Sequence, residues 1–473
     1  ASRRAAVALS CRASSLAVRV SRPMRASIAD ASGPALPWPA RSACLEEPSV
    51  CSGQGLPLAV INALGQTQTN TYDAAGNLSS TANALGQTVK HTYDGRSRRT
   101  STTSAAGRTQ ATVYDKAGRV TQTIAPGQTA GQGTRVQYDA AGRPVQTASP
   151  GGLVSKTSYD SQGRISSTQD PAGNTTTYEY GAKGSPLAGL LVTVNYPTYK
   201  ESYGYDQRGR QTVVHRLLDA NTTLTQRQAF DAAGQRLSST DPAGKTTLYQ
   251  YDGLGRMTQT TDATGGKTVQ TWDAHDNLSS LTDAKGNQHQ FSYDKANRLV
   301  KETRPMGGAI QYAYDAAGQL TLRTDAGGNT RAYTYNAAGL MIQEVHKLNG
   351  TSTDQQISYS HDGDGRLTAY EQTEGSGSLI SSASYSLDAQ GRTATSSIKY
   401  GKLDGSGHIA FTIGQSFNAD GQLQSHTYPD GSSQSYSYAS GRVAKVTMPN
   451  QSEISYGNYS SMVPGQISTQ GAT

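Results

Sequence analysis

Carboxylates dominate the residues of this sequence that could do chemistry. The stretch Ser360-x-Asp362-x-Asp364-Gly365-x5-Glu371 fits the calcium loop of an EF-hand at its later positions, with serine at position 1. An EF-hand needs a helix on each side of the loop, and no stretch of this sequence has helical periodicity. The alternative is that Asp362 and Gly365 belong to a turn that recurs along the chain, and the sequence favours this alternative.

The other candidate groups give weaker patterns. No histidine has metal-ligand spacing, and no Gly-x-Ser-x-Gly nucleophile elbow occurs. Paired carboxylates that act as acid and base need unequal environments, whereas the aspartates here lie in near-identical copies. The sequence therefore predicts no catalytic residue, no metal site and no cofactor. The histidines are His91, His215, His275, His289, His346, His361, His408 and His426.

The aspartates belong to an internal repeat, in which an aromatic anchor is followed by Asp, two spacers, Gly, a polar residue and an aliphatic residue. Seventeen anchors define sixteen intervals, of which ten equal the step from Tyr72 to Tyr93, and the longer intervals indicate loop insertions. The anchors are Tyr72, Tyr93, Tyr114, Tyr138, Tyr159, Tyr180, Tyr205, Phe230, Tyr251, Trp272, Tyr293, Tyr314, Tyr335, His361, Leu387, Phe417 and Tyr438.

Each repeat carries the residues of a turn. Asp opens the turn because its side chain accepts from the backbone two residues on, and Gly permits the positive φ at its end. A second turn signal, as in residues 170–174 and 283–287, follows in each repeat. We predict that the following residues are structural repeat anchors: Tyr72, Asp73, Gly76, Tyr114, Asp115, Gly118, Tyr159, Asp160, Gly163, Tyr251, Asp252, Gly255, Tyr314, Asp315 and Gly318.

The segments between the turns have the pattern of β-strands. Tyr178 and Tyr180 lie two residues apart, which places them on one face of a strand. The expected fold class is all-β, with tandem antiparallel β-hairpin repeats forming a coiled β-sheet shell or spiral ribbon. Seventeen hairpins give about 34 strands, and at roughly 4.8 Å per strand a closed ribbon would surround a space about 50 Å wide.

Composition agrees with a thin repetitive wall. Only 34% of the 473 residues are hydrophobic, and Tyr contributes 27 residues against 4 Phe and 2 Trp. Residues 1–50 hold seven Arg and three acidic residues, so much of the net charge of +7 lies there. The rest has no basic stripe, which argues against nucleic-acid binding. No run approaches the roughly 18 apolar residues of a membrane span.

The sequence predicts three parts. Residues 1–57 are an Ala/Arg/Ser-rich leader that we expect to be disordered or foreign to the repeats. Residues 58–459 are the array of about 17 repeats, and residues 460–473 are a truncated tail. Cys11, Cys44 and Cys51 all lie in the leader, which predicts no disulfide framework or structural zinc within the array.

The repeated motif resembles the YD repeats of the Rhs family. Residues 159–165 (YDSQGRI) followed by residues 170–176 (DPAGNTT) are a close match, and the resemblance covers about residues 58–459. The family includes polymorphic toxin shells, insecticidal toxin-complex C subunits, wall-associated proteins and teneurins. The resemblance implies a hollow β-sheet shell that is secreted or at the cell surface. In bacterial members the shell encloses a C-terminal toxin.

Two functions remain open at this point. The first is a non-catalytic structural scaffold, a fragment of an Rhs-type shell whose partner is an enclosed or downstream toxin domain. The second is a surface adhesin that binds carbohydrate or a partner protein through exposed tyrosines. The bacterial pattern ends with a plug, an autocleavage site and a toxin, and none of these is visible before Thr473. Self-cleavage and toxicity are therefore not carried over.

Overall fold

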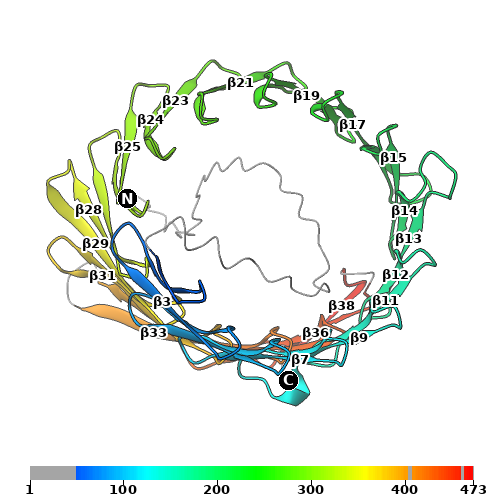
Figure 1. The fold of residues 1–473 in the computed structure, drawn as a ribbon, viewed down its shortest axis with the longest axis horizontal. Coiled ribbons are helices and arrows are strands. Elements are labelled where there is room, and N and C mark those ends of the chain that lie inside the picture. The colour runs from blue at the N-terminus through cyan, green and yellow to red at the C-terminus, as the bar shows by residue number, and fades with distance from the viewer. Residues whose placement is uncertain (1–48, 403–406, 460–462, 472–473) are drawn as a thin grey trace. The chain divides into compact units, whose positions relative to one another are not determined.

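One continuous antiparallel β-sheet of 38 strands makes up the part of the chain that the computed structural model describes, residues 49–402, 407–459 and 463–471. Each strand pairs with the strands before and after it, so the order in the sheet follows the order in the chain (Figure 1). The predicted all-β fold of tandem hairpins is confirmed. The 3₁₀ turn η1 (Ala130–Gln132) is the one helical element among the described residues. No helix in that part of the chain has the length and apolar character that crossing a membrane requires.

The strands are mostly five or six residues long, and those from β28 to β33 are longer. The first half comprises β1 (Ser49–Cys51), β2 (Pro57–Ile61), β3 (Thr67–Tyr72), β4 (Leu78–Ala82), β5 (Thr88–Tyr93), β6 (Arg99–Thr103), β7 (Thr109–Tyr114), β8 (Val120–Ile124), β9 (Thr134–Tyr138), β10 (Pro144–Ala148), β11 (Val154–Tyr159), β12 (Ile165–Gln169), β13 (Thr175–Tyr180), β14 (Leu191–Asn195), β15 (Lys200–Tyr205), β16 (Gln211–Leu217), β17 (Thr223–Phe230), β18 (Arg236–Thr240) and β19 (Thr246–Tyr251). The second half comprises β20 (Met257–Thr261), β21 (Lys267–Trp272), β22 (Leu278–Thr282), β23 (Gln288–Tyr293), β24 (Leu299–Thr303), β25 (Ala309–Tyr314), β26 (Leu320–Thr324), β27 (Thr330–Tyr335), β28 (Met341–Leu348), β29 (Ser352–His361), β30 (Leu367–Glu374), β31 (Leu379–Leu387), β32 (Thr393–Gly401), β33 (His408–Phe417), β34 (Leu423–Thr427), β35 (Ser433–Ala439), β36 (Arg442–Thr447), β37 (Glu453–Gly457) and β38 (Gln466–Gln470).

The turn after each aromatic anchor is built from local hydrogen bonds. In the first complete copy the N–H of Gly76 donates to the carbonyl of Asp73 at 3.0 Å, and Gly76 has a φ of 82° that favours glycine. The register then shifts, so that Tyr72 pairs with Leu78 while Thr71 pairs with Ser80. This bulge recurs after nearly every anchor, which increases the local twist of the ribbon. Most turns at the opposite edge use the same backbone hydrogen bonds without a bulge.

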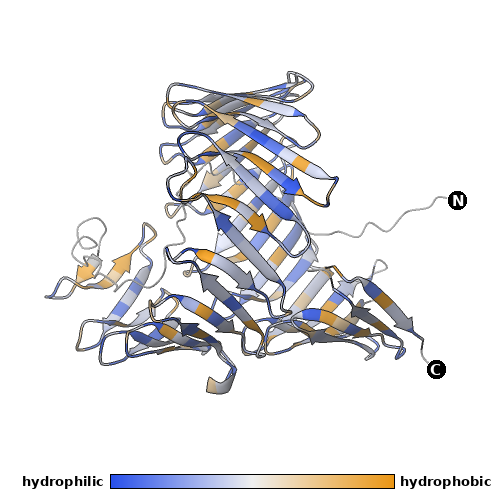
Figure 2. Cartoon of the chain, turned by 90° about the vertical axis from the view of Figure 1, so that its right-hand side faces the viewer, coloured by the Kyte–Doolittle hydropathy of each residue, from blue (hydrophilic) through white to orange (hydrophobic). Residues whose placement is uncertain are grey.

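The ribbon is a single layer with almost no closed core. Among the described residues, the buried hydrophobic side chains are those of Val194, Ile310, Ala383 and Val446. Hydrophobic positions are scattered along the strands and do not gather in one thick layer (Figure 2). Stability must therefore come largely from the hydrogen-bonded ladder and from side chains that link neighbouring repeats.

The sheet extends beyond the limits expected from the sequence. Strand β1 pairs with β2, and Cys51 takes the position of the anchor, one full repeat before Tyr72, with the same register shift. At the other end, Tyr459 follows Tyr438 by the same interval and acts as a further anchor, and β38 pairs with β37. The array therefore begins about nine residues before position 58. Cys51, which the sequence places in the leader, lies in β1 and is disulfide-bonded.

The ribbon winds back until its late strands meet its early strands. The turn between β6 and β7 lies against the turn between β29 and β30, and the turn between β12 and β13 lies against the turn between β35 and β36. Each contact joins strands 23 positions apart in the sheet. Figure 1 shows the early strands near β7 and the late strands near β33 and β36 in the same region. We call this line of contacts the seam, and one passage of 23 strands a coil.

Candidate functional site: the repeat clasp and the seam

The turn aspartate organises each repeat. In the copy that starts at Tyr293, Oδ1 of Asp294 accepts the N–H groups of Ala296 and Arg298, each at 2.9 Å. Its other oxygen, Oδ2, accepts Nε of Arg298 at 2.7 Å. One carboxylate thus closes the turn and fixes the side chain of the arginine four residues later, an Asx turn reinforced by an ion pair.

The same arginine reaches the next repeat. The guanidinium of Arg298 lies 4.8 Å from the ring centroid of Tyr314 and donates to the carbonyl of Asp315 at 2.9 Å. We call a turn Asp, its Arg and the aromatic anchor of the next repeat a clasp. Because the clasp spans two repeats, it couples each hairpin to its neighbour. Further clasps are Asp94–Arg98–Tyr114, Asp115–Arg119–Tyr138, Asp139–Arg143–Tyr159, Asp160–Arg164–Tyr180, Asp206–Arg210–Phe230, Asp252–Arg256–Trp272 and Asp388–Arg392–Phe417.

The anchor hydroxyl makes a second link, in the opposite direction along the chain. Tyr314 donates its hydroxyl to the carbonyl of Leu299, 15 residues earlier, at 2.8 Å. The same bond recurs in most repeats, and in one repeat the ring N–H of Trp272 replaces the hydroxyl and donates to Met257. A buried hydroxyl normally finds a partner. The anchors therefore pack against the wall and bond to it.

The predicted anchor residues lie in separate repeats along one edge of the ribbon and do not converge on a pocket. The tyrosines donate to backbone carbonyls, the glycines have positive φ, and the aspartates accept the backbone N–H four residues on. The tyrosines and their acceptors are Tyr72–Pro57, Tyr114–Arg99, Tyr159–Pro144, Tyr251–Arg236 and Tyr314–Leu299. The glycines are Gly76, Gly118, Gly163, Gly255 and Gly318, and the aspartates are Asp73, Asp115, Asp160, Asp252 and Asp315.

Tyr314→Phe is expected to lower the free energy of unfolding by about 1 kcal/mol, because the Leu299 carbonyl loses its donor while the ring stays in place. Tyr312 lies two residues earlier on the same strand, and its hydroxyl has no hydrogen bond among those the structure describes. Tyr312→Phe is therefore the matched control and should change stability by less. Urea titration followed by circular dichroism compares the two variants; equal losses would contradict a role for the hydroxyl bond.

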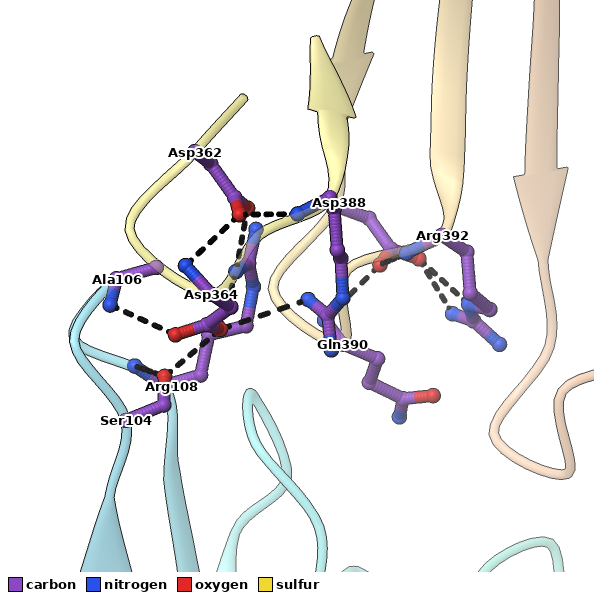
Figure 3. Close-up of polar contacts among 9 residues, drawn as sticks. Ser104, Ala106, Arg108, Asp362, Asp364, Asp388, Gln390 and Arg392 are labelled. Atoms are coloured by element: carbon purple, nitrogen blue, oxygen red, sulfur yellow. Dashed lines mark hydrogen bonds and ion pairs between the residues drawn. The ribbon is translucent and has the colours of Figure 1, made fainter. Parts of the chain in front are cut away.

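Arg108 forms the contact at the near end of the seam (Figure 3). It extends from the turn between β6 and β7, and its Nη1 donates to Oδ2 of Asp362 at 2.8 Å and to Oδ2 of Asp364 at 2.7 Å. Asp364 also accepts the hydroxyl of Ser104 at 2.8 Å and the N–H of Ala106 at 2.9 Å. The side chain of Arg108 is only 14% exposed. This pair is therefore screened far less by solvent than an ordinary surface ion pair.

Three more turns of the early coil touch the late coil. A cavity of about 650 Å³ lies along the seam between the contact of Arg108 and the contact of Gln128. The contacts are Gln128 Nε2 to the Ala419 carbonyl at 3.2 Å, the Gly151 N–H to Asp420 Oδ1 at 2.6 Å, and Arg442 Nη2 to Asp170 Oδ2 at 2.9 Å.

The seam lowers the pKa values of its carboxyl groups. Burial raises the pKa of Asp364, but hydrogen bonds from Ala106, Ser104 and Arg108 outweigh burial, so the pKa falls below its ordinary value. Burial likewise raises the pKa of Asp362, and the backbone N–H of Arg366 together with Arg108 reverses the effect. Both carboxylates are thus held ionised by the groups they bind.

Acid should weaken clasps and seam together. The side chain of Arg98 lowers the pKa of Asp94 to about 2. Unfolded aspartate titrates near pH 3.9, so the stabilisation is complete above about pH 4 and is lost as the pH falls through the lower folded pKa. We expect the thermal midpoint to stay level between about pH 5 and 7 and to fall below about pH 4. Melting curves followed by circular dichroism test this; a steep loss between pH 7 and 5 would contradict it.

The calcium hypothesis does not fit the geometry. The turn of Asp362 lies between two strands, β29 and β30, and Oδ1 of Asp362 accepts the N–H groups of Asp364 and Arg366 as in the other repeat turns. The second oxygens of both aspartates are taken by Arg108. Within the described residues no group of three or more His, Cys, Asp or Glu side chains is arranged to hold a metal ion.

Sequence reasoning missed two sets of residues. The arginine of the repeat was treated only as a polar spacer, although its recurrence four residues after Asp was visible. The seam pairs were not foreseen, because Arg108 and Asp364 are 256 residues apart and no periodicity connects them. The arrangement as a whole can hold a curved wall closed upon itself; its charged groups are paired with one another in these structural roles.

Comparison with known proteins agrees with this architecture. The RHS Repeat family matches residues 72–109, 114–154, 159–199, 230–267, 272–309, 314–352 and 417–453, which is more than half of the chain. No curated protein matches.

Solved structures of Tc toxin components share the fold. The Tc holotoxin pore of Photorhabdus luminescens with mutated TccC3 has a TM-score of 0.61 and 15% identity over 86% of this chain and 26% of that one. TcdB2-TccC3-TEV has a TM-score of 0.56 and 16% identity over 84% of this chain and 24% of that one. TcdB2-TccC3 has a TM-score of 0.52 and 16% identity over 90% of this chain and 29% of that one. This chain thus spans about a quarter of the length of the solved chains it matches.

Hairpins joined by clasps and a ribbon closed by a seam define a structural scaffold of the tandem β-repeat class. Its fold is that of the Tc components just described. The chain belongs to the RHS repeat family.

Proposed function

We propose that this chain is part of the wall of a shell that encloses a polypeptide toxin of its parent protein, for use in competition between cells. The observation that carries the proposal is the closure of the ribbon after 23 strands. At roughly 4.8 Å per strand, 23 strands give a circumference of about 110 Å and a width of about 35 Å. Closed sheets of about 22 strands enclose a lumen that side chains alone do not fill.

The proposal that the cargo is a toxin rests on the matched structures. The matched structures are named as parts of a Tc holotoxin and of TcdB2-TccC3 assemblies. From this likeness of fold we infer that the enclosed cargo is a toxin and that it acts against other cells. We infer on the same ground that the shell is secreted or displayed at the cell surface. Within the wall the described carboxylates of the clasps and seam serve turns and ion pairs, which supports a scaffold without catalysis.

Limited proteolysis of the complete gene product that contains this chain tests enclosure. Every segment outside the repeats is followed by mass spectrometry, in the natural protein and in an Arg108→Met variant that opens the seam. At least one non-repeat segment should resist protease in the natural protein and become sensitive in the variant. Equal digestion in both proteins, or a gene product made only of repeats, would overturn the proposal.

The second function, a surface adhesin that binds carbohydrate, gains no support from the anchors. Their hydroxyls are donated to backbone carbonyls, and arginines cover many of their rings. Side chains committed in this way lie within the wall's own packing. We therefore do not extend the proposal to glycans.

A further inference from the structure

The seam uses the same aspartate–arginine pairing as the clasp, but the arginine and the aspartate come from different coils. In an ordinary clasp Oδ2 of the aspartate binds its own arginine at 2.7 Å, as Asp388 does with Arg392. In the turn of Asp362 that oxygen is taken by Arg108 of the early coil, and Arg366 instead lies 3.8 Å from Asp364. The late coil thus gives up one intra-repeat pair for a pair across the seam.

The reverse exchange occurs at the far end of the seam. The turn after Tyr438 has Ala439 where most other repeats have Asp or Asn, so Arg442 has no carboxylate of its own turn. Arg442 instead pairs with Asp170 of the early coil at 2.9 Å, and its side chain is only 10% exposed. The late coil lacks the turn aspartate of this clasp, and Asp170 of the early coil supplies a carboxylate to Arg442 in its place.

A third departure from the repeat occurs at the residue three positions after the anchor. Asp364 and Asp420 are the two aspartates at this position in the anchor turns of the whole sequence. Both lie in the seam, and each accepts a backbone N–H of the facing turn, from Ala106 and Gly151 respectively. The facing turns open with serine, Ser104 and Ser149, where many equivalent turns open with aspartate. Serine in place of aspartate avoids like charges at the contact.

Glycines permit the close approach of the two coils. A Cβ on Gly363 would lie 3.0 Å from the backbone of Ala105, and a Cβ on Gly127 would clash with Cβ of Ala389. Gly253 has the same place in its own turn as Gly363 and nothing within 4 Å of its Cβ position. The room for a side chain is therefore missing where the coils touch and present in an equivalent turn away from the seam.

We infer that Arg108, Asp364, Asp420 and Arg442 are specificity-determining residues that select which repeat of one coil lies against which repeat of the next. The interaction surface is the edge of the early coil, and its partner is the anchor-turn edge of the late coil of the same chain. The pairing fixes the coil at 23 strands. This inference goes beyond the proposed function, because it does not depend on what the wall encloses.

A slip of the seam by one repeat shows how the residues discriminate. With 21 strands in a coil, the turn of Asp170 would face the turn of Asp420 and bring two carboxylates together. The turn of Arg108 would face the turn of Asn336, which has Ala338 at the position of Asp364. The slipped arrangement loses its attractive pairs and gains a repulsive one, which is how specific interfaces reject wrong partners.

Cross-linking tests the pairing of the repeats. In the full chain with Arg108→Lys, a zero-length carbodiimide reagent joins the lysine to any carboxylate in contact with it, and mass spectrometry identifies the partner. The expected products join residue 108 to Asp362 or Asp364. Comparable joining to Asp388, the carboxylate that a slip in the other direction would present, would overturn the assignment.

Hydrogen exchange tests the close approach with matched variants. Gly363→Ala should speed exchange of the Ala106 amide about tenfold or more, the loss expected for a hydrogen bond to a charged group, and Gly253→Ala should leave it unchanged. Asp420→Ala should likewise speed exchange of the Gly151 amide about tenfold or more. Its control is Gln162→Ala, because Gln162 has the same position in a turn away from the seam. If a seam variant and its control had equal effects on exchange, the inference would be overturned. The Gly363 and Asp420 comparisons are separate tests, because each has its own control.

Discussion

Arg108→Met is expected to lower the free energy of unfolding by about 3 kcal/mol, the scale for removing one partner of a buried charge pair. The substitution keeps the length of the side chain but removes the cation that bridges Asp362 and Asp364, and only Arg366, 3.8 Å from Asp364, remains near them. Because both carboxylates regain water when the turns separate, we expect the seam to open before the individual repeats unfold. Hydrogen exchange of residues 104–109 and 362–366 should rise, while residues 246–303 stay protected.

The matched control for this prediction is Lys245→Met. Lys245 lies four residues after Asp241, as Arg108 lies four residues after Ser104, and it is exposed at a turn of the same edge. Loss of a basic side chain at that position should change stability within about 0.5 kcal/mol. Unchanged exchange in the seam peptides of Arg108→Met would contradict the role given to this arginine.

The repeat and its turns could be predicted because they are local. Asp, Gly and an aromatic anchor at fixed spacing give the same turn wherever they occur, and the strands between them follow from alternation. Cys51 was missed as an anchor because it is neither aromatic nor followed by Asp, and Tyr459 was missed because neither Asp nor a Gly follows it within four residues. The regular spacing of the anchors places both in the array all the same.

The clasp lay partly within reach of the sequence. Asp and Arg lie four residues apart in nine turns of the sequence, which indicates a paired role, and the two side chains form an ion pair in eight of these turns. That Arg298 would lie over Tyr314, however, depends on the path of the chain between repeats. The hydrogen bond from the Tyr314 hydroxyl to the Leu299 carbonyl likewise depends on the direction in which the tyrosine side chain extends across the neighbouring strand.

The seam could not be predicted from one sequence. Whether Arg108 meets Asp362 depends on the number of strands in a coil, which is the sum of many small strand twists. A small change in the mean twist per strand would move the contact by a whole repeat. The visible signals were the departures from the repeat, Asp364, Asp420 and Ala439, which have a purpose only once the facing coil is known.

Asp388→Ala is expected to lower the free energy of unfolding by about 2–3 kcal/mol, because one substitution removes every bond of a clasp carboxylate. Oδ1 of Asp388 accepts the N–H groups of Gln390 and Arg392, each at 2.9 Å, and Oδ2 accepts Nε of Arg392 at 2.7 Å. Without the carboxylate the turn loses its closure, and Arg392 is no longer held 4.3 Å from the ring of Phe417. The effect should therefore spread to the next repeat.

Asp388→Asn separates the two parts of that effect. The amide keeps an oxygen for the backbone N–H groups, as Asn418 does in the following repeat, where Oδ1 accepts from Asp420 and Gln422. Only the ion pair is lost, so the cost should be about 1 kcal/mol or less. Urea titrations rank the natural chain, the Asn variant and the Ala variant in that order of decreasing stability. Equal losses for both variants would mean that the ion pair and not the turn supplies the stability, because the backbone bonds that Asn preserves would then contribute nothing.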